Sequence, residues 1–391
     1  MSVTGTWMQT IAQAWLVLTL TNSAIKLALV NVLQFAPILV FGLVAGLIAD
    51  RFPRRSILVA TQAIAALIAV TLTLLTWSDS VQLWHIYALA LGMGIVNAFD
   101  MPSRQAFVGD LVDREELPNA IALNSSLFNA GRLIGPAIAG ILLAAYGPAL
   151  CFAVNAISYI AVLASLLLMS IPKMIERSRS AKRLAQIREG ISYVRNTPAV
   201  ALTMTMVALV GIFGLNFNVW MPLLAKNDFQ TGAGGFGVLM AVLGLGSLVG
   251  ALLLAFRVRS AEPRRMLATG ALLGGAEIIL GISAIVGLSF YLALGVVMVL
   301  GFAMTSTMAM ANTIVQSSTP AELRGRVMSV YMTLFAGTAP FGALLAGAIA
   351  DFVSAPASIM IGGILTISVV GYLIVKSGDQ LNISASRVRT G

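Results

Sequence analysis

Gly46-Leu47-Ile48-Ala49-Asp50-Arg51-Phe52-Pro53-Arg54-Arg55 joins two long apolar segments, one over residues 24–49 and the other over residues 56–77. The turn holds one acid, three arginines and a proline. Charged side chains are expelled from hydrocarbon, and proline interrupts a helix interior. One segment therefore ends here and the next begins. Because each segment has about 20 or more apolar residues, the pattern predicts two spanning helices joined by a tight polar turn.

The composition extends this interpretation to the whole chain. Of its 391 residues, 59% are hydrophobic and 10% are charged, whereas a soluble domain has about 25% charged residues. Apolar runs of about 20 residues, bounded by turn or charged residues, predict spanning helices. We expect an all-α polytopic membrane protein with twelve such helices, near residues 3–20, 24–49, 56–77, 83–101, 118–145, 149–171, 198–223, 233–256, 265–285, 288–311, 321–349 and 356–375.

The basic residues predict the orientation of these helices. Most of the 24 Lys and Arg residues follow even-numbered segments or lie in the tail, whereas the odd-numbered loops hold only Lys26 and Lys226. Positive residues remain cytoplasmic. We therefore expect both termini and the even-numbered loops in the cytoplasm. The net charge of +9 reflects this topology and does not indicate nucleic-acid binding.

The chain is predicted to consist of two similar halves. A polar stretch divides it into a six-helix bundle over residues 1–171, a basic cytoplasmic linker over 172–197 with an amphipathic surface helix, a second bundle over 198–376, and a tail over 377–391. A shift of 207 residues places Gly135 on Gly342, and a shift of 210 places Pro53-Arg54-Arg55 on Pro263-Arg264-Arg265. Transporters with such repeats bind substrate between them, near the midplane.

Enzymatic chemistry is not supported by the sequence. His85 is the only histidine and Cys151 the only cysteine, so a Ser-His-Asp triad at any other position, an intramolecular disulfide and a thiolate metal cluster are excluded. The chain has no G-x-x-x-x-G-K-[ST] phosphate loop. We predict no enzyme activity, no cofactor and no metal.

Charged residues at membrane depth are costly and are therefore candidates for function. Arg132 lies in the fifth segment on one helical stripe with Ser125, Asn129 and Pro136, which could line a water-filled cavity. A purely structural arginine that pairs with a carboxylate or with helix-end carbonyls is the alternative.

Two acids are further candidates. Asp100 stands one helical turn before Arg104, and a local ion pair is the alternative to a functional role. Glu277 lies well inside the ninth segment, where a structural partner is favoured over a proton site.

Uncharged polar side chains in the spans describe a large neutral pocket with aromatic walls, which suits a bulky amphipathic ligand. Each of them could instead make an interhelical hydrogen bond. They are Gln9, Gln13, Asn31, Gln34, Asn97, Asn124, Asn129, Asn216, Asn218, Trp220, Tyr331 and Thr333.

The opening turn, with Gly46 four residues before Asp50 and Arg51, Arg54 and Arg55 after it, resembles the signature loop of the major facilitator superfamily of secondary transporters. The resemblance implies that Asp50 latches the cytoplasmic side by binding the start of the eleventh helix, with the three arginines as its charge network. The alternative is that the arginines merely anchor the turn in the cytoplasm. Thr319-Pro320-Ala321-Glu322 is predicted to start that helix, with Thr319 as N-cap, Pro320 at the first position and Glu322 completing a capping box.

The fifth segment contains Gly131, Gly135-Pro136 and Gly140. Small residues four apart allow close helix packing, and proline bends the helix. The pattern resembles the fifth-helix motif of proton-coupled exporters in the superfamily, which favours export.

Three stretches resemble one bacterial branch, the transmembrane secretion effectors, which includes enterobactin exporters and macrolide efflux proteins. They are Gly5-Thr6-Trp7-Met8-Gln9 with Ala14-Trp15-Leu16-Val17-Leu18, Ala98-Phe99-Asp100-Met101-Pro102-Ser103-Arg104-Gln105-Ala106, and Glu322-Leu323-Arg324-Gly325-Arg326-Val327-Met328-Ser329. The likeness implies proton-driven export of a siderophore or a drug across the inner membrane by a monomer.

Two features depart from this branch. The first segment begins almost at Met1, so the first helix is expected to be short or truncated, and whether Met1 is the true start stays open. The fourth segment lacks the arginine that many drug/proton antiporters carry at membrane depth, so Arg132, Asp100 or Asp50 would have to serve in proton coupling. An importer of the same fold and a non-transporting membrane scaffold or sensor remain the alternative functions.

Overall fold

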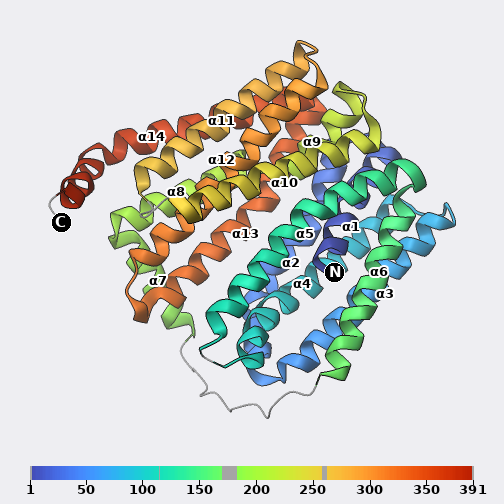
Figure 1. Cartoon of the computed structure of the whole chain (residues 1–391), viewed down its shortest axis with the longest axis horizontal. Coiled ribbons are helices and arrows are strands. Elements are labelled where there is room, and N and C mark those ends of the chain that lie inside the picture. Colours follow the sequence, from blue (N-terminus) through green and yellow to red (C-terminus); the bar gives the residue numbers. More distant parts are fainter. Residues whose placement is uncertain (1, 114, 170–182, 258–261, 390–391) are drawn as a thin grey trace. The chain divides into compact units, whose positions relative to one another are not determined.

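The structure, a computed structural model, describes residues 2–113, 115–169, 183–257 and 262–389 (Figure 1). Within these ranges every regular element is a helix. The bounds are α1 Ser2–Thr21, α2 Ala24–Arg51, α3 Arg54–Trp77, α4 Leu83–Leu111, α5 Leu117–Tyr146, α6 Pro148–Leu168, α7 Arg183–Asn196, α8 Pro198–Phe213, α9 Phe217–Leu223, the π-helix η1 Leu224–Asp228, α10 Gly232–Arg257, α11 Pro263–Ile285, α12 Phe290–Ser317, α13 Ala321–Phe352 and α14 Ala355–Arg389.

Nine helical stretches among the described residues are long and apolar enough to cross a membrane. The α8–α9–η1 region counts as one of them, over Pro198–Asp228. Of the other elements that the sequence predicts as spans, α1 and α4 do not meet this measure, and the described part of α5 contributes a shorter apolar stretch, Ala130–Tyr146. A polytopic helical membrane protein is thus confirmed, and the total of twelve spans stays a prediction.

Three helices have bounds that differ from those of the predicted spans. The fourth helix continues beyond residue 101, through Pro102 to Leu111. The last predicted span, near 356–375, agrees with the apolar stretch Ala355–Lys376, and its helix runs on to Arg389. The predicted continuous helix over 198–223 is interrupted between Phe213 and Phe217, where the Asn216 amide donates to the carbonyl oxygen of Ile212 at 2.8 Å. Side chains can thus satisfy backbone groups that a helix break exposes inside a membrane.

The predicted start of the eleventh span is also corrected. The N-cap of α13 is Pro320 and its side chain makes no cap hydrogen bond. The Thr319 hydroxyl donates instead to the carbonyl oxygen of Val315, at the end of α12, at 2.6 Å. Because the N-cap position is held by Pro320, which has no side-chain acceptor, and not by Thr319, the predicted capping box is absent.

The helices group into two compact units. The first comprises Met1–Ser180 and Met221–Ala241, and the second comprises Ala181–Trp220 and Val242–Gly391. In the first unit α3 lies along α6, α2 along α4, and α1 against α5 and α6 (Figure 1). In the second unit α11 lies along α14 and α12, and α8 contacts α13 and α14.

Small residues set the spacing of these pairs. A Cβ built on Gly94 of α4 would lie 2.6 Å from the carbonyl oxygen of Leu33 in α2. In the second unit a Cβ on Gly274 of α11 would lie 2.7 Å from the carbonyl oxygen of Gly363 in α14. Lipid gives apolar helices little reason to associate, so such close backbone contact supplies much of the dispersion energy that holds them together.

The two arginines that begin α3 tie it to the ends of two other helices. Arg54 forms an ion pair with Asp110 of α4 at 2.6 Å and donates to the carbonyl oxygen of Ala106 at 3.1 Å. Arg55 donates to the last carbonyl oxygens of α6, those of Leu166 and Leu167, at 2.8 Å each. Cations at a helix C-terminus satisfy free carbonyls and oppose the negative end of the helix dipole.

Asp110→Asn should destabilise the protein by about 2 kcal/mol, because Arg54 is 13% exposed and loses most of its charge compensation. The matched control is Glu262→Gln, whose ion pair with Arg265 is 3.9 Å long and about half exposed. The control should change stability by less than about 0.5 kcal/mol. Thermal unfolding of the purified variants in detergent measures both changes in stability. If the two variants lose the same stability, the ion pair between Arg54 and Asp110 does not hold α3 to α4.

Candidate functional site

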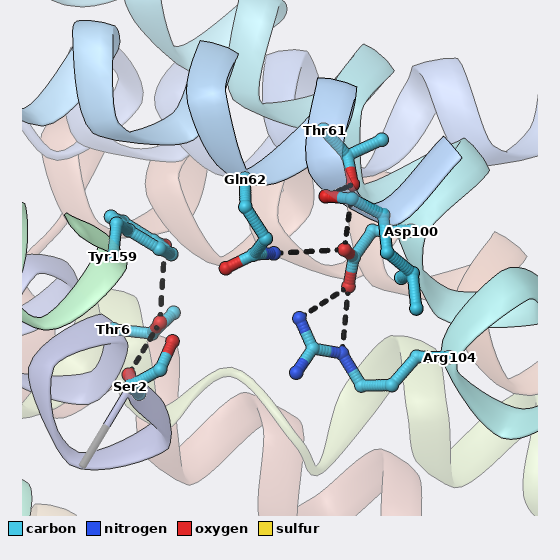
Figure 2. A network of polar contacts seen from close by, with 8 residues as sticks. Ser2, Thr6, Thr61, Gln62, Asp100, Arg104 and Tyr159 are labelled. Carbon is cyan, nitrogen blue, oxygen red and sulfur yellow. Dashed lines mark hydrogen bonds and ion pairs between the residues drawn. The ribbon is translucent and has the colours of Figure 1, made fainter. Parts of the chain in front are cut away.

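A buried carboxylate joins α3 and α4 at the centre of a polar cluster (Figure 2). Asp100 of α4 is 7% exposed. Its Oδ1 accepts from the Thr61 hydroxyl and from the Gln62 amide of α3, each at 2.9 Å. Its Oδ2 accepts from Arg104, one turn on, with contacts of 2.9 Å from Nε and 2.8 Å from a terminal nitrogen.

These donors stabilise Asp100 as an anion. Hydrogen bonds to ionised groups are the strong ones, and a buried charge without them would be costly. The local Asp100–Arg104 pair that the sequence suggested is present, but the two α3 partners were not predicted. Thr61 and Gln62 stand inside an otherwise apolar span, and two adjacent polar residues there are the signal that could have identified them.

A second polar seam lies beside this cluster, between α1 and α6. The hydroxyl groups of Thr6 and Tyr159 lie 3.1 Å apart, and Thr6 also donates to the carbonyl oxygen of Ser2 (Figure 2). Further along, the Asn155 amide donates to Gln9 Oε1 at 2.7 Å. Gln9, a predicted pocket residue, therefore makes an interhelical hydrogen bond.

Of the predicted pocket residues in the first unit, the structure brings two together. The Gln34 amide of α2 donates to Gln13 Oε1 of α1 at 3.2 Å, and Gln13 is 2% exposed. The Asn31 amide points back to its own helix, to the carbonyl oxygen of Leu27 at 3.4 Å. Asn97 of α4 is half-buried.

The predicted stripe on α5 is described only in part. Arg132 is half-buried and takes part in at least one polar or electrostatic interaction. Pro136 is buried. The side chains of Ser125 and Asn129 lie outside the described residues, so the stripe stays a prediction.

The predicted gating loop is described in part as well. The side chains of Gly46, Asp50 and Arg51 lie outside the described residues. Arg54 and Arg55, which the family resemblance places in the charge network of Asp50, bind Asp110 and the end of α6. The structure therefore gives these two arginines partners within the first unit.

In the second unit, polar candidates gather at the interruption between α8 and α9. Asn216 and Trp220 line a narrow pocket together with Ser358 of α14. The indole of Trp220 donates to the Ser358 hydroxyl at 2.9 Å, and this hydroxyl donates to the carbonyl oxygen of Ala346 in α13 at 2.8 Å. Asn218 is half-buried. Tyr331 is buried elsewhere on α13 and its hydroxyl donates to the carbonyl oxygen of Met308 at 3.3 Å.

The glycines of the fifth-helix motif are packing positions within the first unit. A Cβ on Gly131 would lie 2.7 Å from the Val3 side chain of α1. A Cβ on Gly135 would lie 2.7 Å from Trp7 Cβ and 2.9 Å from the carbonyl oxygen of Thr4. At Gly140 it would lie 2.6 Å from the Cα atom of Gly237 in α10. The motif thus permits α5 to contact two neighbouring helices backbone to backbone.

Gly135→Ala should destabilise the protein by about 1–3 kcal/mol, since the added methyl group meets backbone atoms of α1 that cannot rotate away. Gly275→Ala in α11 is the matched control, because a Cβ there meets nothing within 4 Å. It should be neutral or stabilise slightly through better helix propensity. Unfolding temperatures in detergent distinguish the two, and an unchanged Gly135→Ala protein would contradict the packing role.

A family model described as transmembrane secretion effector matches residues 1–386. The staphyloferrin A transporter of Staphylococcus aureus is 31% identical over 252 residues, which cover 64% of this chain and 63% of that protein. The multidrug efflux pump Tap of Mycolicibacterium fortuitum is 28% identical over 357 residues, which cover 89% of this chain and 86% of that protein.

A solved structure of a POT family transporter in complex with 5-aminolevulinic acid has a TM-score of 0.77 at 11% identity, covering 97% of this chain and 95% of that chain. This likeness concerns the fold alone. The alignments with three of the curated relatives span 63%, 59% and 58% of their lengths. Among the described residues, no group of three or more His, Cys, Asp or Glu side chains could hold a metal ion.

Proposed function

The chain belongs to the transmembrane secretion effector family of the major facilitator superfamily, and we propose from this premise that it exports an amphipathic organic compound by proton antiport. The family and the relatives are transporters and not enzymes. The observation that carries the proposal is the extent of the family match, over residues 1–386, which includes nearly every described helix. A siderophore or a drug such as a macrolide is the proposed substrate class.

We propose twelve spans, which are the nine apolar stretches together with α1, α4 and α5. These three helices carry Gln9, Gln13, Asn97, Asp100 and Arg132. Polar residues in a membrane helix face the protein interior or a water-filled cavity. In agreement, Gln9, Gln13 and Asp100 are buried. Helices that avoid lipid in this way do not need a high hydropathy.

The proposal also includes two pseudo-symmetric six-helix halves, with residues 172–197 as the linker between them. Equivalent contacts support it. Gly135 of α5 packs against α1, and Gly342, 207 residues later in α13, packs against the carbonyl oxygen of Ile212 in α8. Likewise α3 lies along α6 and α11 lies along α14. In such transporters, rocking of the halves alternates access to a central site.

Within this proposal the polar residues have different tasks. Asp50 and Arg51 gate the cytoplasmic side, and Arg54 and Arg55 fix α3 to α4 and α6. Arg132 and the Asn129 amide on the same predicted stripe of α5 contact substrate. Asp100 serves as a fixed anion that holds α3 to α4. The excess of basic residues in the even-numbered loops supports cytoplasmic termini in a bacterial inner membrane, with the monomer as the transporting form.

The proposal is tested with proteoliposomes that contain a pH-sensitive dye. They are challenged in turn with a catecholate siderophore, erythromycin and tetraphenylphosphonium. We expect a pH change with one class of compound, and its loss in Asp50→Asn, because the latch needs the carboxylate. The direction of the pH change distinguishes antiport from symport. Silence with every compound, from protein that elutes as a folded monomer, would favour the scaffold or sensor alternative.

Asp100→Asn should lower the transport rate by about tenfold or more and destabilise the protein by about 1–3 kcal/mol, because Arg104 loses its charged partner and the α3–α4 link weakens. Asp79→Asn is the control, since Asp79 is exposed and its φ of 51° suits asparagine equally well. Initial rates in the same vesicles and unfolding in detergent provide the comparison. Wild-type rates in Asp100→Asn would remove Asp100 from the mechanism.

A further inference from the structure

Glu277 is a second buried carboxyl whose surroundings are opposite to those of Asp100. It lies in the middle of α11 and is 0% exposed. Neither of its carboxyl oxygens accepts a hydrogen bond of standard geometry from a described residue. A Cβ on Gly363 of α14 would lie 2.9 Å from Glu277 Cβ, so the packing leaves no room beside the side chain. Asp100 has four donor contacts, whereas no described residue donates to Glu277 with standard hydrogen-bond geometry.

No positive charge in the described part of the chain compensates Glu277. The helices packed against α11 are α8, α12 and α14, and α8 carries no ionisable side chain. Besides Glu277, the ionisable side chains of α11, of α12 and of α14 as far as Lys376 are Arg264, Arg265, Tyr291, Tyr372 and Lys376, and the side chains of α14 beyond Lys376 lie outside the described residues. Both tyrosines are more than half exposed. Arg265 lies about 18 Å along α11 from Glu277. Lys376 lies about 15 Å along α14 from Thr366, the neighbour of Glu277.

Thr366 of α14 is placed to meet the carboxyl. A Cβ on Gly214 would lie 2.9 Å from Thr366 Oγ1 and 3.2 Å from Glu277 Oε1, so both groups face the same point. Buried threonines in other spans, such as Thr203 and Thr307, donate to the carbonyl four residues back. The hydroxyl of Thr366, which is 0% exposed, makes no such bond to a described residue. It therefore remains available to Glu277.

An ionised carboxylate in this place would lack both water and a counterion. The Born energy of such a group in a medium of low dielectric constant is on the order of tens of kcal/mol, and a real side chain becomes neutral instead. A neutral carboxylic acid needs far less compensation, and the Thr366 hydroxyl that faces it can serve as a hydrogen-bond partner. The geometry is thus that of a carboxyl that holds a proton.

We infer that Glu277 is a proton-binding site of the second unit, neutral while α8, α11 and α14 are packed together and ionised when water reaches it. Its role in coupling rests on the proposed antiport function. In one cycle the O–H bond breaks, the proton passes to water, and the carboxylate later takes a proton from the opposite side. The carboxyl itself is otherwise unchanged.

The interruption between α8 and α9 provides the moving part. Gly214, which the carboxyl faces, is the first residue beyond α8. The pocket at the interruption is lined by Phe213, which precedes Gly214 in the chain, and by Gly362, which precedes Gly363. A helix that is already broken can bend here without loss of further backbone hydrogen bonds. Such a bend would admit water from the pocket to the carboxyl.

Infrared spectroscopy of the full chain in lipid nanodiscs tests proton binding without any substrate. We expect the C=O stretch of a neutral carboxylic acid at neutral pH. It should be absent from Glu277→Gln and retained in Glu262→Gln, at the N-cap residue that precedes α11. Thr366→Val should shift the frequency of this band, because it removes the neighbouring hydroxyl. Glutamine has the shape of the neutral acid and should fold. A wild-type spectrum with no band sensitive to Glu277→Gln would overturn the inference.

Transport of erythromycin tests the coupling. In proteoliposomes Glu277→Gln should reduce transport driven by a pH gradient by about tenfold or more, while exchange without a gradient stays within about twofold of wild type. Retained gradient-driven transport in Glu277→Gln would overturn the coupling role. If the wild type does not move erythromycin, the same comparison is made with the catecholate siderophore and with tetraphenylphosphonium. If it moves none of the three, the proposed antiport fails, and the infrared result alone decides whether Glu277 binds a proton.

Discussion

A bilayer offers no hydrogen-bond partner to a buried polar group, and the rest of this structure depends on that constraint. Every donor and acceptor in the hydrocarbon must find its partner inside the chain. The helices satisfy the backbone. Side chains satisfy the places where the helices end or break, as Arg55 does at the end of α6 and Asn216 does between α8 and α9. Lys226 does the same for α1, since its ammonium donates to the carbonyl oxygen of Leu18 at 2.6 Å.

The same constraint separates the two buried carboxyls. Asp100 is surrounded by donors from two helices, so the structure stabilises its charge and uses it to join α3 and α4. Apart from the Thr366 hydroxyl, Glu277 is surrounded by apolar atoms and glycine backbone, so the structure stabilises its neutral form. A fixed charge suits a structural or gating task, whereas a group that can exchange its proton suits coupling. Environment, and not residue type, decides between these roles.

Close packing and interruption of helices serve different ends. Gly135 and Gly140 allow α5 to approach α1 and α10 to backbone contact, which rigidifies the first unit. The interruption after Phe213 instead gives the seventh predicted span a point at which it can bend. A transporter needs both properties, because rigid bundles transmit a movement only if some element between them can change shape.

The sequence by itself determined the class of this protein, because the thickness and polarity of the bilayer set the length of each apolar run and the positions of the charges. Most helix bounds, the close-packed glycines of α5 and the Asp100–Arg104 pair could be predicted, since all depend on local spacing. The partners of Asp100 on α3, the attachment of Arg54 and Arg55 to α4 and α6, and the surroundings of Glu277 could not. The hydrogen bonds of Asp100 with α3, and those of Arg54 and Arg55, join residues that lie 38 to 112 positions apart in the sequence. Only the packing of the helices decides which of these residues meet.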